Sequence, residues 1–371
     1  MPPPQRLRTA GPAPPGPPVG GPRPAAIETA GRPRDLIKPS RTLTIVSMAL
    51  GIGVLVGITI RAGAGLREVF FLLPAASHLL ALAALVTAIA ARAGQWLILA
   101  RALGVQLTVR SAFLAQVTGE AAGAVTPARV AHDPMRIAVA SRDSRNVGGI
   151  GAVLVGEMLA KAVALLGIAV LLLLLLGEPR LPAYGILLYA GATLATAGVA
   201  MLLARKRVSH VSPLWWRRSR LGEQRWRGVR LQAHRLRRRL GRLRRIGAAT
   251  VLVLMVVTFV HVGARLAVAP ALVLGAGIDA EMGPLLLWPL LMLYVVTLIP
   301  LPGGGGGVEL GFAASLERVV PTEALPALTL WWRFYTFFLA AIAGGIALTA
   351  GSRLLSTRRD AGRDAGRDAG P

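Results

Sequence analysis

The chain has 371 residues, of which 54% are hydrophobic and 16% are charged, and its mean hydropathy is +0.59. Soluble domains carry about a quarter charged residues. This composition therefore excludes an ordinary soluble protein and favours a multi-pass membrane protein. The sequence contains no cysteine, which excludes disulfides, thiol catalysis and cysteine-based metal sites.

The formal net charge of +25 is unevenly distributed, and 39 of the 42 cations are arginine. Residues 205–245 hold sixteen cations and one acid, whereas residues 246–351 hold three cations and five acids. The charge lies mostly between and outside the apolar runs, which argues against a folded basic face for nucleic acid. We therefore interpret it first as a signal of membrane orientation.

The two ends of the chain predict disordered tails. Residues 1–41 are rich in Pro, Gly and Arg, and residues 352–371 repeat Asp-Ala-Gly-Arg. Neither segment has enough apolar residues to offset its ordering entropy. We expect no signal peptide, because the first apolar run begins near Thr42 and is long enough to stay as a span. Residues 42–351 are thus the expected membrane domain.

Six apolar runs are each long enough to cross a hydrocarbon core of about 30 Å. They are residues 42–60, 69–91, 147–176, 183–204, 246–274 and 325–350. Two further apolar segments are interrupted. Residues 111–140 break at Thr126 and Pro127, and residues 284–316 break at Pro300, Pro302 and a run of five glycines.

The breaks matter because non-helical backbone at membrane depth must be buried in protein or line a wet cavity. The predicted fold is an all-α bundle of six spans with two re-entrant hairpins that open to opposite sides, an arrangement typical of an inverted repeat. Basic residues in 92–110, 205–245 and 353–359 place these segments and both termini in the cytoplasm. Two alternatives stay open: either broken segment spans the membrane, or residues 300–307 form a surface loop.

Three stretches resemble one family. They are Val125-Thr126-Pro127-Ala128-Arg129 followed by Arg136, Ile299-Pro300-Leu301-Pro302-Gly303-Gly304 followed by Glu309, and Trp332-Arg333-Phe334-Tyr335. Together they resemble the flippase-like membrane domain of lysylphosphatidylglycerol synthases, the UPF0104 group, over about residues 42–350. The resemblance implies a multi-pass protein of the bacterial inner membrane that handles lipid.

The chain departs from that family pattern in three places. Ala131-His132-Asp133 stands where Gly-Glu is usual, and Glu157 with Lys161 replaces a Glu-Arg-x-x-Asp pattern in the third span. The usual Pro-Gly-Gly is extended to five glycines. These changes affect the expected substrate more than the expected fold.

Arg129 and Arg136 are the first candidates for binding a phosphate headgroup, because guanidinium groups bind phosphate bidentately. Their spacing of seven predicts one helical face, with His132 and Asp133 as polar lining; the alternative is positive-inside charge at a helix mouth. Glu157 and Lys161 lie one turn apart in an apolar span. They either face a central cavity or neutralise each other as a structural pair.

The second break supplies the other candidates. Backbone amides of Gly303, Gly304 and Gly305 are expected to attract an anion. Glu309 either caps the following helix or carries a proton. Arg333 either lines the site or belongs to an aromatic belt at the membrane surface.

The basic segment contains one apolar stripe on an arginine-rich helix. Its members are spaced 3, 4, 3, 4 and 3 residues apart: Trp226, Val229, Ala233, Leu236, Leu240 and Leu243. This pattern predicts an amphipathic helix on an anionic lipid surface. A coiled-coil seam and a nucleic-acid contact are the alternatives.

The sequence as a whole favours a protein that moves a lipid or lipid-linked headgroup between leaflets, with anionic phospholipid or lipid-linked phosphate as its partner. We expect no cofactor, no metal and no enzymatic activity. A non-transporting scaffold or regulator of envelope lipid or glycan synthesis is the alternative. An aminoacyl-phosphatidylglycerol synthase is less favoured, because full synthases of the family it resembles carry a large soluble catalytic domain. No phosphate-binding P-loop occurs, so we expect an ion or lipid gradient to drive transport.

Overall fold

The computed structural model describes residues 41–144, 146–176, 180–205, 222–295, 297 and 299–350. The predicted tails and residues 206–221 lie outside these residues. Within the described residues all regular secondary structure is helical, which confirms the all-α prediction.

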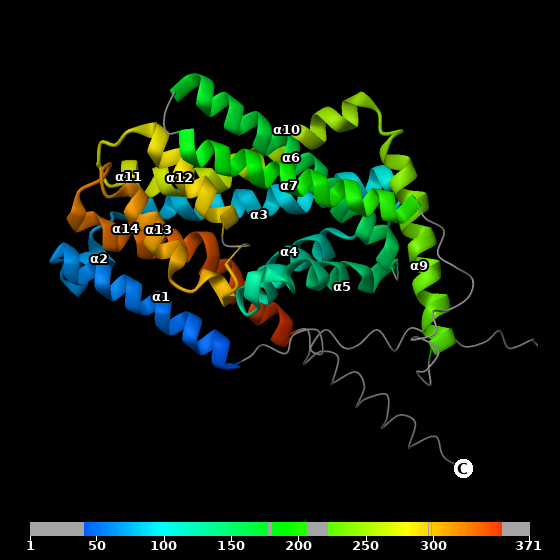
Figure 1. Ribbon diagram of the computed structural model, residues 1–371, viewed down its shortest axis with the longest axis horizontal. Helices are drawn as coiled ribbons and strands as arrows, with labels where there is room; N and C mark the ends of the chain where they lie inside the picture. The colour runs from blue at the N-terminus through cyan, green and yellow to red at the C-terminus, as the bar shows by residue number, and fades with distance from the viewer. Residues whose placement is uncertain are drawn as a thin grey trace, which may run out of the picture.

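Six helices in the described part of the chain are long and apolar enough to cross a membrane. They run along the long axis of the molecule (Figure 1) and confirm the prediction of a multi-pass membrane protein. Five are α1 (Arg41–Ala62), α3 (Ala75–Leu103), α6 (Val147–Leu176), α7 (Arg180–Arg205) and α10 (Ala248–Leu266). The sixth begins as α14 (Leu325–Arg333), passes through a π-helix at Phe334–Phe338 and continues to Ala350.

Two predicted boundaries are wrong. The run at residues 69–91 is divided into a short α2 (Leu66–Phe71) and the 29-residue α3, which carries Arg92 inside the helix rather than in a connector. Arg92 stays in the helix because acidic partners elsewhere in the bundle pair with it. The run at residues 246–274 is divided at Ala267 into α10 and α11 (Val268–Gly275).

The first hairpin consists of α4 (Val109–Ala124) and α5 (His132–Ser144), joined through a 3-10 turn at Pro127–Arg129. Its break is stabilised by one side chain. The Thr126 hydroxyl donates to the carbonyl of Ala122 at 2.8 Å and accepts from the amide of Ala131 at 3.2 Å. Backbone groups that the broken helix leaves unpaired are thereby satisfied, as burial at membrane depth requires.

The second hairpin consists of α12 (Met282–Val295) and α13 (Gly307–Leu316), with a 3-10 turn at Pro302–Gly304. Its break depends on glycine. The four residues 303–306 have φ values of 63°, 88°, 45° and 84°, a region where L-residues are disfavoured. A Cβ on Gly306 would also lie 2.9 Å from the carbonyl oxygen of Leu50 in α1. The run of glycines is therefore required by both backbone conformation and close packing.

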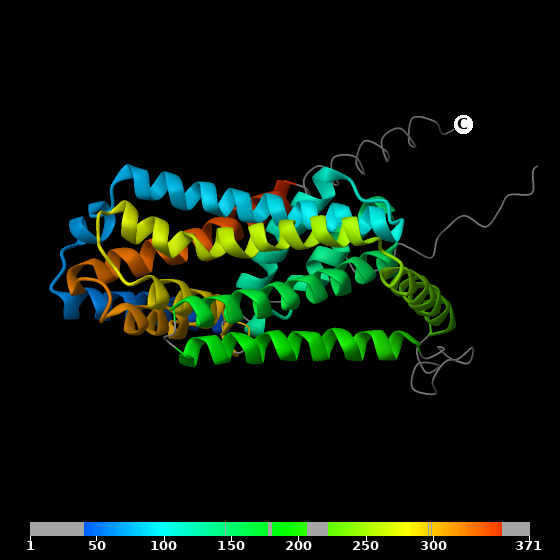
Figure 2. The same cartoon turned by 90° about the horizontal axis from the view of Figure 1, so that it is seen from above.

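The two hairpins enter from opposite ends of the bundle and their tips meet near its middle (Figures 1 and 2). The α4–α5 hairpin opens toward the end where α9 lies, and α12–α13 opens toward the other end. Pro302, Gly303 and Gly304 are buried, so the surface-loop alternative for residues 300–307 is wrong. The geometry matches the predicted opposed pair, while the assignment of one end to the cytoplasm stays a prediction.

The arginine-rich helix α9 (Gly222–Leu243) runs across the ends of the long helices (Figure 1). Leu236, Leu240 and Leu243 pack into the hydrophobic cluster around Trp96. The prediction that the apolar stripe faces lipid is wrong for these three leucines, because the ends of α3 and α6 cover them.

Candidate functional site

Glu157 of α6 is the centre of a buried ionic arrangement, with 2% of the residue exposed. Its carboxylate accepts hydrogen bonds from Arg92 Nε at 2.8 Å, Arg136 Nη2 at 2.6 Å and Trp96 Nε1 at 2.5 Å. Of the two alternatives for Glu157 and Lys161, the mutual structural pair is not the one seen, since the ion-pair partners of Glu157 come from α3 and α5. Lys161 Nζ lies 5.9 Å from the ring centroid of Tyr294.

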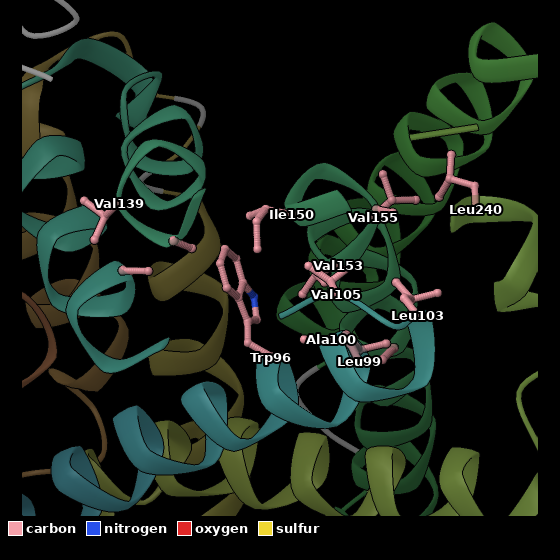
Figure 3. Packing of buried hydrophobic residues seen from close by; sticks show 14 of the residues in the cluster. Trp96, Leu99, Ala100, Leu103, Val105, Val139, Ile150, Val153, Val155 and Leu240 are labelled. Carbon is pink, nitrogen blue, oxygen red and sulfur yellow. The ribbon is translucent and has the colours of Figure 1, made fainter. Parts of the chain in front are cut away.

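Trp96 holds this arrangement within the hydrophobic packing. Its ring lies among buried apolar residues of α3 and α6, including Leu99, Ile150 and Val153 (Figure 3). The guanidinium carbon of Arg136 lies 4.3 Å from the centroid of the same ring. Trp96 thus donates to the carboxylate of Glu157 and stacks on its cationic partner, which fixes both charges in place.

Glu120 of α4 is the second acidic centre. It pairs with Arg129, with Arg92 at 3.2 Å and, more loosely, with Arg265 Nη1 at 3.7 Å. Arg265 Nη2 also donates to the carbonyl of Thr336 at 3.0 Å. Arg92 bridges the two acidic centres, because its guanidinium contacts both Glu120 and Glu157.

The outer margin of the arrangement lies at the start of α5. Asp133 accepts from Arg136 at 3.0 Å and contacts His132 Nδ1 at 2.8 Å, and 44% of its side chain is exposed. The prediction that Arg129 and Arg136 share one helical face is wrong, because α5 begins at His132 and Arg129 lies in the preceding 3-10 turn. Both arginines nevertheless reach the same acidic groups.

We call these eight residues the central ion cluster: Arg92, Glu120, Arg129, His132, Asp133, Arg136, Glu157 and Arg265. Four guanidinium groups face three carboxylates, so one positive charge is in excess even with His132 neutral. The most deeply buried charges balance, because Arg92 and Arg136 lie with Glu120 and Glu157, and the excess belongs to the less buried Arg129 and Arg265. An uncompensated charge inside a protein costs several kcal/mol. The cluster is consequently suited to an anion.

A small cavity adjoins the cluster between α3, α4, α10 and the last helix. Its polar wall is formed by Arg92, Gln116, Glu120, His261 and Arg265, and its apolar wall includes side chains of α3 and α4. About 20 Å³ is open to the centre of a water molecule. That space holds a water molecule and is too small for a phosphate headgroup.

Gln116, which lines this cavity, has a buried side-chain amide without hydrogen-bond partners. The residue is 1% exposed, and neither its amide nitrogen nor its amide oxygen has a hydrogen-bond partner. Buried polar groups are nearly always bonded, because leaving one unsatisfied costs about 1–3 kcal/mol. An amide that lines the cavity without a partner is available to a polar ligand.

The second break forms a separate ion pair. Arg333 is 5% exposed, donates from Nε to Glu309 at 2.7 Å and from Nη2 to the carbonyl of Gly303 at 2.5 Å. Arg333 is therefore inside the protein, and the aromatic-belt alternative is wrong. Its guanidinium carbon lies 4.4 Å from the ring centroid of Phe337, which Arg129 approaches at 5.8 Å. Phe337 thus connects the two hairpin tips.

The glycine amides do not match the predicted anion cradle. The amide of Gly304 donates to Leu301 at 3.1 Å, and that of Gly305 donates to Pro302 at 3.3 Å. Gly303 contributes its carbonyl to Arg333. The amides of Gly304 and Gly305 are thus occupied within the turn.

Sequence reasoning missed the roles of Arg92, Trp96, Glu120 and Arg265. Arg92 looked like a loop residue, since it follows an apolar run. Glu120 and Arg265 lie inside apolar segments, and the rule that ionisable residues within spans mark functional sites identifies both. Nothing in the sequence distinguishes Trp96 from an ordinary core residue.

The model of the family described as the lysylphosphatidylglycerol synthase TM region matches residues 45–344. This range includes both hairpins and every residue of the central ion cluster. The chain belongs to this family. No curated protein sequence matches the chain.

Membership in the lysylphosphatidylglycerol synthase TM-region family confirms the resemblance found in the sequence and agrees with the multi-pass architecture. The family comprises the non-catalytic membrane part of these synthases. The central ion cluster and the paired hairpins lie within this membrane region.

Proposed function

We propose that this protein moves an anionic lipid, or a lipid-linked phosphate headgroup, between the two leaflets of the membrane. The observation that carries this proposal is the excess of guanidinium groups in the central ion cluster, at the place where two opposed hairpins meet. Transporters bind their substrates at discontinuous helices near the membrane midplane. The positive excess, carried by the less buried Arg129 and Arg265, favours a negative headgroup.

Arg265 is the first contact we assign to the headgroup. Its side chain is 23% exposed, against 9% for Arg92 and 1% for Arg136, and its distance to Glu120 is the longest of the arginine pairs in the cluster. A loosely paired guanidinium binds phosphate without first losing a strong ion pair. Gln116 would donate from its amide, and Arg92 would complete the positive wall.

Arg129 and Arg136 keep the headgroup role predicted from the sequence, with Glu157 as the acid that holds Arg136 in place. Lys161 lies on the same helix as Glu157 and contacts Tyr294, so its role in the proposal is a secondary one. The acyl chains would remain in the bilayer beside the apolar wall of the cavity, which includes Leu85, Ile89 and Val117.

The cavity must widen before a headgroup enters, because the present space holds only water-sized molecules. The contact between the hairpin tips, with Phe337 beside both Arg129 and Arg333, is the barrier we assign to the closed arrangement. Separation of one hairpin would open the cluster to one leaflet, and separation of the other would open it to the opposite leaflet. Glu309 and Arg333, as a neutral pair, would not compete for the headgroup.

The test is leaflet exchange of fluorescent lipids in liposomes that contain wild type, Arg265→Gln or Arg101→Gln. Arg101 is exposed on α3 and provides the matched control. We expect Arg265→Gln to slow exchange of phosphatidylglycerol at least about tenfold, equivalent to about 1.4 kcal/mol. Arg101→Gln should match wild type. Exchange of phosphatidylcholine should be slow for all three.

Equal exchange by wild type and Arg265→Gln would contradict the role of the cluster. Wild-type protein that moves none of several anionic lipids would contradict transport itself and favour the scaffold or regulator. A distinct result, exchange of neutral and anionic lipids at the same rate, would retain transport and contradict charge selection.

A further inference from the structure

Helix α9 carries more positive charge than any other described helix. Between Gly222 and Leu243 it has eight arginines and one glutamate. It runs across the ends of the long helices rather than along them (Figures 1 and 2), so its axis follows the plane of the membrane. None of this charge belongs to the central ion cluster or to the second ion pair.

The C-terminal half of α9 is fixed to the bundle. Arg239 and Arg242 both donate to the carbonyl oxygen of Leu103, the last residue of α3, with Arg242 at 3.2 Å. Leu240 is 8% exposed and lies in the same cluster as Leu103 and Val155 (Figure 3). This half of the helix therefore directs its apolar face along the long helices, toward the interior of the membrane region.

A second contact fixes the middle of α9 to α6. The amide of Gly148 donates to Gln232 Oε1 at 3.0 Å. A Cβ on Gly148 would collide with the backbone carbonyl of Gln232, so the two backbones touch at this point. The direction in which α9 faces is thus determined by its contacts with both α3 and α6.

The N-terminal half continues the same apolar face without the same cover. Val229 precedes Leu236 by seven residues and Leu240 by eleven, which places all three on one side of the helix. Val229 is nevertheless 43% exposed, and Trp226 on the same stripe is only half-buried. Because one face of one helix points in one direction, Val229 and Trp226 are directed toward the bilayer beside the bundle.

The arginines of α9 are crowded. Partial burial, together with the neighbouring Arg242 and Arg238, lowers the pKa of Arg239 below its ordinary value. Crowded like charges repel, and anions close to the helix relieve that repulsion. The negatively charged headgroups of a leaflet supply such anions in the plane in which α9 lies.

We propose that the N-terminal half of α9 lies in the headgroup layer of the adjacent leaflet. Val229 and Trp226 point toward the acyl chains, and Arg227 and Arg230 contact anionic lipid headgroups. Tryptophan and arginine are the side chains that favour this boundary, since the ring has an apolar body and the guanidinium reaches phosphate. The proposal does not depend on transport, because no residue of the headgroup site takes part.

The absence of native cysteine allows a direct test. Val229→Cys and Leu231→Cys are labelled with an environment-sensitive fluorophore in the full-length protein in lipid nanodiscs. Leu231 is also an exposed aliphatic residue, 51% accessible, but it lies on nearly the opposite side of the helix. The discs contain phosphatidylcholine alone or with about one-third phosphatidylglycerol, which models an anionic leaflet.

In anionic discs we expect iodide to quench the label at position 229 at least about threefold less than the label at 231, as for a residue below the headgroups. Neutral discs, or salt at about 0.5 M, should reduce this difference because they remove or screen the attraction. Arg227→Gln combined with Arg230→Gln should reduce it as well, while an unchanged thermal unfolding temperature shows that the protein remains folded.

Equal quenching at positions 229 and 231 in anionic discs would overturn the proposal. Protection of both labels that appears only when RNA is added to neutral discs would also overturn it and would assign the surface to nucleic acid. Protection at position 229 alone, with loss of the difference in neutral discs, is the result that supports a lipid partner.

Discussion

The two hairpin breaks solve the same physical problem in different ways. At the first break a side chain, Thr126, replaces the missing backbone partners, and the surrounding helices contribute an excess of arginine. At the second break four glycines in left-handed conformation fold the backbone onto itself, and the nearby charges, Glu309 and Arg333, are balanced.

This difference suits the two breaks to different roles. Under the proposed function, side-chain contacts and loosely paired charges would adjust to a headgroup, so the first break suits binding. A glycine turn packed against α1 at Leu50 has little room to adjust, so the second break suits a fixed partner against which the first hairpin closes. Substitutions at the first region should change selectivity, and substitutions at the second should change folding.

Glu157→Gln should have the largest effect on stability. It leaves Arg92 and Arg136 buried with their shared carboxylate removed, and breaking a buried pair costs about 3–5 kcal/mol. We expect a large fall in the thermal unfolding temperature of the purified protein. Glu281→Gln, at an exposed position before α12, is the control and should cost less than about 1 kcal/mol. Similar unfolding temperatures for the two variants would show that the cluster does not stabilise the fold.

Gly306→Ala should have the next largest effect. It places a Cβ at φ 84° and 2.9 Å from the Leu50 carbonyl, and strained backbone of this kind costs about 1–3 kcal/mol. Gly53→Ala in α1 meets no atom within 4 Å and should be neutral or stabilising by about 0.5–1 kcal/mol. Thermal unfolding of the two variants compares a glycine that the turn requires with one that the helix merely tolerates.

Thr126→Val tests the first break. It removes two hydrogen bonds without changing the shape of the side chain, and we expect a loss of about 1–2 kcal/mol because backbone groups stay buried without partners. Thr196→Val in α7 is matched, since Thr196 also donates to a carbonyl four residues earlier, but at an exposed site. That control should change stability by about 0.5 kcal/mol or less. Equal losses would mean that Thr126 has no special part in holding the break.

Gln116→Leu should have the smallest effect on stability and the opposite sign. It replaces a buried amide without partners by an apolar side chain, which is expected to stabilise the protein by about 1 kcal/mol while it slows exchange of anionic lipid. Gln95→Leu is the contrast, because Gln95 donates to Thr258 at 2.9 Å and its loss should destabilise. A Gln116→Leu protein that is less stable and transports normally would remove this residue from the headgroup site.

The length of the apolar runs was enough to predict the long helices. The ion pairs could not be predicted, because their partners are far apart in the sequence. The bounds of α6, residues 147–176, follow directly from a long apolar run that has no proline and only two charged residues, Glu157 and Lys161. Arg92 could not be placed, because its partners lie 28 and 65 residues away in the sequence, and an arginine at the end of an apolar run looks like a loop. The same limit explains why Lys161, the only opposite charge within one turn, was the one partner that the sequence offered for Glu157.

Sequence patterns at the breaks identified the right places and only part of the chemistry. Proline marked both turns and glycine marked the second, yet nothing in the glycine run showed that the amides of Gly304 and Gly305 bond within the turn. The apolar stripe of α9 was visible in the sequence, whereas its division between protein and lipid depends on where the ends of α3 and α6 lie.

The π-helix at Phe334–Phe338 sets the rotation about the helix axis between the two halves of the last helix. An α-helix turns by about 100° per residue, so the extra residue in a π turn rotates everything after it by roughly that amount. Arg333 before the turn points to Glu309, and Ala340 after it lines the cavity. Deleting one residue here would leave both halves helical but would turn one of them away from its partner. The extra residue of the π turn therefore sets the rotation by which the last helix contacts α13 before the turn and lines the cavity beside α4 after it.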